Sequence, residues 1–266
     1  MSHPVPLHAH ASSWPVTGAM PVLQPDEVHV WHASITAWTP HRERLASLLD
    51  QEELGRSARF HFDRDRNQLI AAHALLRALL GGYVGCAPAA VGFETGPAGK
   101  PYAASPPAAA ALEFNLSHSA DLVMIAMCRG CAVGVDVERW SDDVDPLELA
   151  PHSFSNAEQA ELAALTPDQQ RAAFFTCWSR KEAWIKASGL GVSRGLDYFD
   201  MVVAADRRGR ILADRLDPAR AERCQVVDLD AGAGYSAALV VGEQGRRIRR
   251  FTLDPNLGST ESGVAM

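Results

Sequence analysis

Two long helical patterns, one in each half of the chain, constrain the fold more than any other feature of the sequence. The first covers residues 64–80, with apolar side chains on one face, and the second runs from the capping sequence TPDQ at 166–169 to Gly189. Short strand patterns accompany both helices, at residues 28–35, 113–116, 122–128, 131–138, 199–203, 210–212, 224–228 and 236–241. Helices beside strands that are joined mostly by local hairpins indicate an α+β fold.

A helical block beside several strands in each half also suggests two similar lobes, although no residue-level repeat recurs at a fixed period. A chain of 266 residues is long enough for one large domain or two small ones. We expect a loose N-terminal leader at 1–20, a first lobe at 21–132, a second lobe at 133–254 and a loose C-terminal tail at 255–266. The turn Arg129-Gly130 is expected to join two of the strands as a hairpin.

The charge and hydropathy of the chain exclude several classes of partner. A formal net charge of −7 argues against general binding to nucleic acid or to an anionic membrane, and a solvated strand edge explains the short basic run at 246–250 better. The longest apolar runs, such as residues 122–128, fall far short of the ~20 residues that a membrane helix needs. Residues 1–20 lack the basic start and apolar stretch of a signal peptide, so we expect a cytoplasmic location.

Five cysteines in a chain of this length favour reduced thiols, because their spacing is not that of a disulfide framework. Cys128 and Cys131 form a single CxxC pair around the expected turn. Since there is only one such pair, we interpret them as ordinary strand residues rather than as a zinc or redox site.

The sequence GVDVE at 134–138 is the first pattern that points to chemistry. Side chains alternate between the two faces of a strand, so Asp136 and Glu138 share one face while Val135 and Val137 share the other. A solvated sheet surface is the ordinary explanation for acids on a strand. Two like charges at this spacing repel unless a cation lies between them, however, and a hard divalent ion is a natural partner.

The helix that ends before Gly189 contributes a third acid. Trp178, Glu182 and Lys186 are spaced by four residues and therefore lie on one side of this helix. A pair such as Glu182 and Lys186 is often a routine surface ion pair. A carboxylate beside an amine would also complete an oxygen-ligand Mg²⁺ site with a cation next to a reacting phosphate.

The sequence FNLSHS at 114–119 predicts a strand end that leads into a polar turn, where Ser117, His118 and Ser119 offer hydrogen-bond donors. A serine hydrolase is not indicated, because the sequence contains no GxSxG element. Binding to a phosphate is the better interpretation of these donors.

Together these three patterns resemble the motifs of the 4'-phosphopantetheinyl transferases of the Sfp type, which move the phosphopantetheine arm of coenzyme A to a serine of a carrier protein. The family motifs FN(I/L/V)SHS, (I/V)G(I/V)D(I/V)E and WxxKExxxK stand here in the same order at 114–119, 133–138 and 178–186. RFHFDRD at 59–65 and GKP at 99–101 are also similar to family sequences, and the resemblance spans about residues 25–250.

The resemblance implies two similar lobes related by a pseudo-twofold axis, each with a small, mostly antiparallel sheet packed against helices, and a ligand cleft between them. It implies that Asp136, Glu138 and Glu182 hold Mg²⁺, or alternatively Mn²⁺, against the pyrophosphate of coenzyme A. It further implies that polar and cationic side chains contact the phosphates of the nucleotide, namely Arg56, Arg64, Lys100, Ser117 and His118.

On this basis we expect an enzyme that transfers 4'-phosphopantetheine from coenzyme A to a serine hydroxyl of an apo acyl or peptidyl carrier protein and releases 3',5'-ADP. Glu182 would accept the proton of the serine, directly or through a water, and Lys186 would offset charge on the departing nucleotide. The alternative is a non-catalytic module that binds coenzyme A or a carrier protein. Carriers of fatty acid, polyketide or nonribosomal peptide synthesis all fit this expectation, and we expect a monomer.

Overall fold

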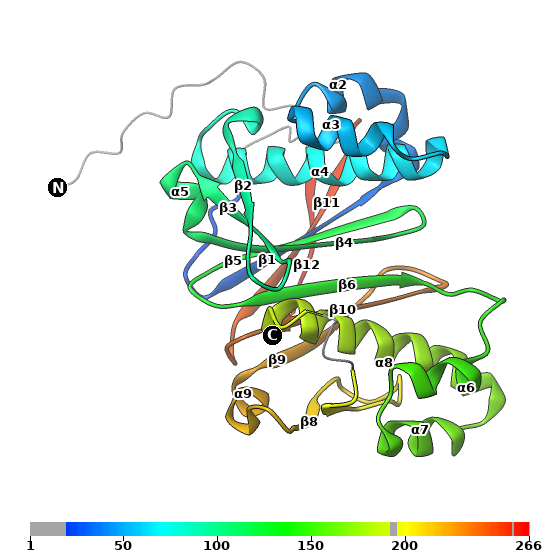
Figure 1. The fold of residues 1–266 in the computed structure, drawn as a ribbon. Helices are drawn as coiled ribbons and strands as arrows, with labels where there is room; N and C mark the ends of the chain where they lie inside the picture. Colours follow the sequence, from blue (N-terminus) through cyan, green and yellow to red (C-terminus); the bar gives the residue numbers. More distant parts are fainter. Residues whose placement is uncertain (1–19, 192–195, 257, 266) are drawn as a thin grey trace.

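The computed structural model describes residues 20–191 and 196–256 and the backbone of residues 258–265. Residues 1–19 of the expected leader lie outside the described residues. Two separate sheets, each packed with helices, divide the described chain into two lobes and confirm the α+β fold class (Figure 1). Among the described helices, none combines the length and the apolar character that a membrane crossing requires.

The first lobe is built on a five-stranded sheet in the order β12-β11-β1-β5-β4, with a separate two-stranded sheet of β2 and β3. Its strands are β1 (Glu27–Ser34), β2 (Gly92–Thr95), β3 (Pro101–Ser105), β4 (Leu112–Ser119), β5 (Leu122–Arg129), β11 (Arg247–Asp254) and β12 (Gly258–Ala265). Its helices are α1 (Ile35–Trp38), η1 (Thr39–His41), α2 (Arg42–Ala46), α3 (Gln51–Ala58), α4 (Asp63–Val84), η2 (Pro88–Ala90) and α5 (Pro107–Ala110).

The second lobe is built on a three-stranded sheet in the order β6-β10-β9, with a separate pair of β7 and β8. Its strands are β6 (Val133–Arg139), β7 (Phe199–Met201), β8 (Ile211–Asp214), β9 (Gln225–Leu229) and β10 (Tyr235–Val241). Its helices are α6 (Pro146–Leu149), η3 (Ala150–His152), α7 (Asn156–Ala163), α8 (Pro167–Ser188) and α9 (Pro218–Arg223).

The two long helices are the ones that the sequence patterns predict. Helix α8 begins after the capping residue Thr166 and ends at Gly189, whose φ of 64° is a left-handed conformation that glycine adopts without strain. Helix α4 runs farther than expected, because it passes through Gly81 and Gly82 and ends only at Gly85, with φ of 71°. A β-carbon at Gly81 would lie 2.7 Å from the carbonyl oxygen of Cys86, so the glycine allows the following chain to fold back closely.

The expected hairpin around Arg129-Gly130 is wrong. Strand β5 pairs with β4 and β1, whereas β6 pairs with β10 in the other sheet. The hairpin in this region joins β4 to β5, with Ser119 opposite Leu122, and its turn contains Ala120 at a positive φ of 48°. A bend at residues 130–131, with Gly130 at φ of 72°, does follow β5, but it leads from one lobe to the other.

The end of the chain returns to the first lobe. Strand β11 pairs with β1 in parallel, and β12 pairs with β11 in antiparallel orientation. We expected residues 247–254 in the second lobe and residues 255–266 as a loose tail, so both segments differ from that expectation. Both strands add to the outer part of the first sheet through nonlocal pairing, which a local strand pattern does not reveal.

The two lobes share a structural device that supports their similarity. In each, a short helix of 8 residues begins with a capping box and is followed in the same lobe by a helix of 22 residues. The capping glutamate Glu53 of α3 accepts from Arg77 Nε of α4 at 2.6 Å, and Glu158 of α7 accepts from Lys181 Nζ of α8 at 2.6 Å. All four side chains are buried, so each lobe fixes its long helix with an internal ion pair.

Lys181→Met should destabilise the protein by about 3–5 kcal/mol, because it leaves the buried carboxylate of Glu158 without its cation. The double variant Lys181→Met/Glu158→Gln should recover part of this loss, since the amide can still cap α7. The measurement is urea unfolding of both variants. Arg171→Met is the control, because its ion pair with Asp142 is exposed and should be worth no more than about 1 kcal/mol. Equal effects of Lys181→Met and Arg171→Met would contradict this account.

Candidate active site

The lobes meet where β4 of the first sheet lies beside β6 of the second (Figure 1). Their backbones are not paired, and side chains of β4 instead accept hydrogen bonds from backbone amides of β6. The donor and acceptor pairs are Val135 N to Asn115 Oδ1 at 2.8 Å, Val137 N to Ser117 Oγ at 3.4 Å and Arg139 N to Ser119 Oγ at 3.0 Å. We call these three contacts the β4–β6 ladder.

The ladder places the two acids of β6 against the serines of β4. Ser117 Oγ donates to Asp136 Oδ1 at 2.9 Å, and Ser119 Oγ donates to Glu138 Oε2 at 3.2 Å. Asp136 is only 2% exposed, whereas Glu138 is half-buried. The two carboxylates therefore lie at the boundary of the lobes, as the alternation of GVDVE requires.

Helix α8 brings the third acid and an amine to the same place. Lys186 Nζ donates to Asp136 Oδ1 at 2.6 Å and to Ser117 Oγ at 3.0 Å. Lys186 thus pairs with the acid of the strand, and not with Glu182 one turn earlier on its own helix. Glu182 is half-buried and near enough to Asp136 for the two charges to interact.

A glycine allows α8 to lie this close to β6. A β-carbon at Gly134 would lie 2.1 Å from the carbonyl oxygen of Ala183 and 2.4 Å from the backbone nitrogen of Ala187. Any other residue at this position would push the helix away from the strand. The glycine of GVDVE therefore sets the distance between the acids of β6 and the side chains of α8.

The electrostatics of the three acids favour a cation. Burial raises the pKa of Glu138 to about 7, and the charge of Asp136 adds to the increase. Burial also raises the pKa of Glu182, again with a contribution from Asp136, while Lys186 acts in the opposite direction. The carboxylates are therefore close enough to repel one another, and a bound cation would relieve this repulsion.

The second oxygen of Asp136 also fits a metal. Asp136 Oδ2 is buried and has no hydrogen-bond partner among the described residues, which is costly for a carboxylate. A hard divalent cation accepts such oxygens as ligands. Within residues 20–191 and 196–256, no three His, Cys, Asp or Glu side chains are already grouped as metal ligands, and Lys186 supplies the positive charge at Asp136.

Known protein families match nearly the whole described chain. The family model of the 4'-phosphopantetheinyl transferase superfamily matches residues 132–240, and that of the N-terminal part of a 4'-phosphopantetheinyl transferase matches residues 36–130. A 4'-phosphopantetheinyl transferase HetI from Nostoc sp. is 36% identical over 172 residues, which cover 65% of this chain and 73% of the relative. The chain belongs to the 4'-phosphopantetheinyl transferase superfamily.

Two further relatives are similar to this transferase over a longer part of the chain. A 4'-phosphopantetheinyl transferase from Bacillus subtilis is 30% identical over 198 residues, which cover 74% of this chain and 84% of the relative. The 4'-phosphopantetheinyl transferase Sfp from Bacillus subtilis strain 168 is 29% identical with the same coverage of both chains. The chain is therefore an enzyme of the transferase class, which is favoured over the alternative of a non-catalytic binding module.

The residues that we expect to bind coenzyme A lie in different surroundings. Lys100 Nζ donates to the carbonyl oxygen of Val133 at 2.9 Å, at the start of β6, and burial lowers the pKa of this lysine. His118 is exposed on β4, next to Ser117, whose hydroxyl is buried inside the ladder. The charge of Asp136 therefore acts on His118, whereas the hydrogen bond of Lys100 is to the start of β6.

The two expected arginines are both exposed. Arg64 pairs with Asp65 at 3.1 Å and lines a hollow of about 860 Å³ on the first lobe, whose lining includes Ser119 and, at its edge, Arg139 from the end of β6. Arg56 is exposed on α3, and no contact in the described part of the chain joins it to the acids. The structure therefore brings Arg64 to the boundary of the lobes more clearly than Arg56.

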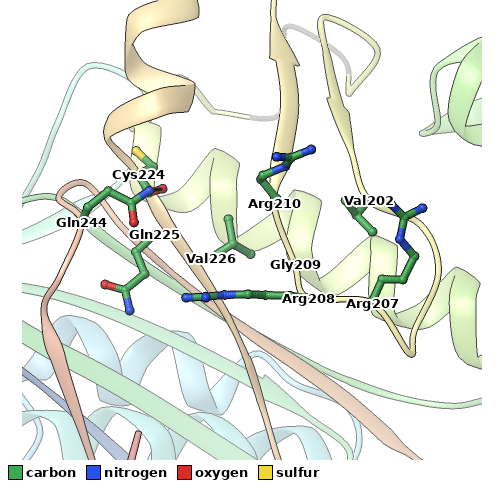
Figure 2. A pocket seen from close by; sticks show the side chains of 9 residues that line it. All are labelled: Val202, Arg207, Arg208, Gly209, Arg210, Cys224, Gln225, Val226 and Gln244. Atoms are coloured by element: carbon green, nitrogen blue, oxygen red, sulfur yellow. Dashed lines mark hydrogen bonds between the residues drawn. The ribbon is translucent and has the colours of Figure 1, made fainter. Parts of the chain in front are cut away.

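A second hollow, of about 590 Å³, lies elsewhere on the second lobe, between the β7–β8 connection and β9 (Figure 2). Its lining includes Arg207, Arg208 and Arg210, and the fully buried Arg180 donates to carbonyl oxygens of the same connection. None of the residues that we expect in the active site lines this hollow.

Sequence reasoning missed the role of Asn115 and of Ser119. Both were visible in FNLSHS, and with Ser117 they occupy every second position of a strand, so they had to share one face. From the sequence we interpreted Ser117, His118 and Ser119 as donors to a phosphate, and we did not recognise that Asn115, Ser117 and Ser119 accept hydrogen bonds from the backbone of β6. The strand alternation indicated that these three side chains share a face, but it could not identify β6 as the strand that this face contacts.

Asn115→Leu should destabilise the protein by about 1–3 kcal/mol, because it removes the acceptor of the buried Val135 amide while keeping the side-chain size. Ser119→Ala is the matched control, since Ser119 and Arg139 are accessible to water that can replace the lost contact. We expect its effect to stay below about 1 kcal/mol. Denaturant unfolding measures both, and a cost for Asn115→Leu no greater than that of the control would contradict a ladder that joins the lobes.

Proposed function

We propose that the enzyme transfers 4'-phosphopantetheine from coenzyme A to a serine hydroxyl of an apo acyl or peptidyl carrier protein. The observation that supports the proposal is Asp136 at the lobe boundary, which keeps a buried oxygen without a partner among the described residues while its charge acts on Glu138 and Glu182. The relatives are named as transferases of the same group. A cytoplasmic location and a monomer remain part of the proposal as expected from the sequence.

Asp136, Glu138 and Glu182 would hold Mg²⁺, with Mn²⁺ as an alternative, because all three offer hard oxygen ligands. When bound, the ion would neutralise negative charge on the pyrophosphate of coenzyme A. Lys100, His118 and Arg64 would bind the phosphates of the nucleotide, and Ser117 and Arg56 complete the expected set.

The residues of α8 would carry the proton transfer and part of the charge. Glu182 accepts the proton of the carrier serine, directly or through a water, and its raised pKa suits this role. The serine oxygen forms a bond to the β-phosphorus while the bond to 3',5'-ADP breaks. Lys186, which donates to Asp136 in the structure, would offset negative charge on the departing nucleotide.

The decisive experiment is mass spectrometry of several apo carrier proteins after incubation with the enzyme, coenzyme A and Mg²⁺. We expect one or more carriers to gain the mass of phosphopantetheine on a serine. Binding of coenzyme A or a carrier without any mass gain would favour the non-catalytic module instead. Comparing acyl and peptidyl carriers in one mixture also identifies the preferred class.

Asp136→Asn should lower turnover by roughly 10²-fold or more, since metal binding at such sites contributes several kcal/mol to the transition state. Glu138→Ala should be milder, because a water can replace one ligand of Mg²⁺. Chelation with EDTA should abolish transfer by the parent enzyme. The matched control is Asp142→Asn, an exposed acid outside the site. Full activity of Asp136→Asn in excess EDTA would refute the metal assignment.

Lys186→Met gives a test of the metal that does not depend on activity. The variant removes the only cation that contacts Asp136 in the described structure, so the free protein should melt at a lower temperature. Added Mg²⁺ should restore the melting temperature more in this variant than in the parent. Equal responses of both proteins to Mg²⁺ would mean that the ion does not bind at Asp136.

Lys100→Ala should weaken binding of coenzyme A by about 10- to 150-fold, the typical loss of one charge-assisted phosphate contact. His118→Ala should have a similar effect. Calorimetry with coenzyme A and with dephospho-coenzyme A then shows which residue binds the 3'-phosphate. The variant that lacks this residue should bind the two ligands with nearly equal affinity, because it has already lost the contact to the 3'-phosphate. Equal affinity of the parent for both ligands would exclude a 3'-phosphate contact from either residue.

A further inference from the structure

Cys128 and Cys131 lie at the connection between the lobes, where β5 ends and the chain passes to β6. Their Sγ atoms are 3.6 Å apart, and Cys128 Sγ also lies 3.1 Å from the carbonyl oxygen of Cys131. Gly130, with φ of 72°, forms the turn that brings the thiols together. Cys128 is the strand residue that we expected from the sequence, whereas Cys131 lies between β5 and β6 and belongs to neither strand.

The surroundings of the two thiols differ. Cys128 is completely buried in the core between the two sheets, whereas Cys131 is half-exposed on the turn. A small molecule can therefore reach Cys131 but not Cys128. This is the arrangement of an attacking and a resolving thiol.

We propose that Cys128 and Cys131 form a redox-active dithiol that exchanges with small-molecule disulfides such as oxidised glutathione. This site is separate from the proposed transfer reaction and does not depend on it. Disulfide formation needs the sulfurs to approach from 3.6 Å to about 2.05 Å. Cys131 lies between β5 and β6 and belongs to neither strand, so strand pairing does not fix its position.

The electrostatics assign the order of the reaction. The hydrogen bond from Cys128 lowers the pKa of Cys131 to about 7, and the positive charge of Arg246 supports this against the opposing effect of burial. The same hydrogen bond, together with burial, raises the pKa of Cys128. Cys131 is therefore the first thiolate, and Cys128 becomes easier to deprotonate once the sulfur of Cys131 is in a mixed disulfide.

The exchange balances without a further reactant. The Cys131 thiolate attacks one sulfur of oxidised glutathione, breaks its S–S bond and releases one glutathione thiolate. Cys128 then loses its proton and attacks Cys131 Sγ, which forms the internal disulfide and releases the second glutathione. Two protein thiols are oxidised, one glutathione disulfide is reduced to two thiols, and the two protons pass to the released thiolates through solvent.

The other cysteines serve as internal controls. Cys177 and Cys224 are buried, and Cys86 is half-buried. None of the three has a second sulfur in contact within the part of the chain that the structure describes. Burial raises the pKa of Cys86, so its thiol should react with iodoacetamide at neutral pH about tenfold more slowly than Cys131, or slower still.

The experiment treats the reduced full-length protein with oxidised glutathione, blocks free thiols by alkylation after denaturation, and maps each cysteine by mass spectrometry. Before alkylation, we expect the intact mass to fall by two hydrogens. After alkylation, we expect a peptide that contains the Cys128–Cys131 disulfide and a label on each of the other three cysteines. Dithiothreitol should reverse the change. A stable glutathione adduct on Cys131 with Cys128 still alkylated, or no oxidation of either thiol, would overturn the proposal.

Two variants test the assigned order. Cys128→Ser should trap one glutathione on Cys131, whereas Cys131→Ser should leave Cys128 reduced. Cys86→Ser is the matched control and should form the disulfide as the parent does. Adduct formation on Cys128 in Cys131→Ser at the parental rate would contradict the assignment. The mapping of the parent protein needs no substitution, so misfolding of a variant cannot decide the result. Phosphopantetheine transfer by the reduced protein is measured in a separate experiment.

Discussion

The β4–β6 ladder is the interaction on which the site depends. Two sheet edges meet there without backbone pairing, and the buried amides of β6 need acceptors that only the side chains of β4 supply. Asn115, Ser117 and Ser119 provide one acceptor each, at the two-residue spacing that a strand imposes. Since the same serines also bind the carboxylates, the contact that joins the lobes fixes the positions of Asp136 and Glu138.

The remaining groups reach this boundary through the packing of α8. Gly134 lets the helix approach β6, and the buried Lys181 anchors the other side of the helix to Glu158. With the helix held on both sides, Glu182 and Lys186 have little freedom to leave the lobe boundary. In the proposed site, the first lobe contributes the hydroxyls of β4, the imidazole of His118 and Lys100, and the second lobe contributes the acids and Lys186. Neither lobe alone contains the complete set of groups.

Local patterns in the sequence predicted the parts of this arrangement that depend on local physics. The 22-residue helix α8, with its capping box and terminal Gly189, followed from residues 166–189, and the shared face of Asp136 and Glu138 followed from strand alternation. The pairing partners could not be predicted in this way. The turn signal at Gly130 was correct, yet β6 pairs with β10, about a hundred residues later, and the true hairpin turn at Ala120 carries no glycine. The contact of Lys186 with Asp136 likewise joins residues 50 positions apart and needs the fold to be known.

Two buried carboxylates of the molecule, Glu158 and Asp136, differ in how completely their oxygens are bound. Both carboxylate oxygens of Glu158 are bound, by Lys181 and by backbone amides of Ser155 and Met201, and this pair needs nothing further. At the lobe boundary one oxygen of Asp136 has no partner among the described residues, and the charge of Asp136 acts on Glu138 and Glu182. Incomplete pairing costs stability, so a protein keeps it where a ligand completes it. The same chain thus contains a satisfied buried ion pair and an incompletely satisfied one, and Ser119, which donates to Glu138 beside the second pair, lines the hollow that also contains Arg64.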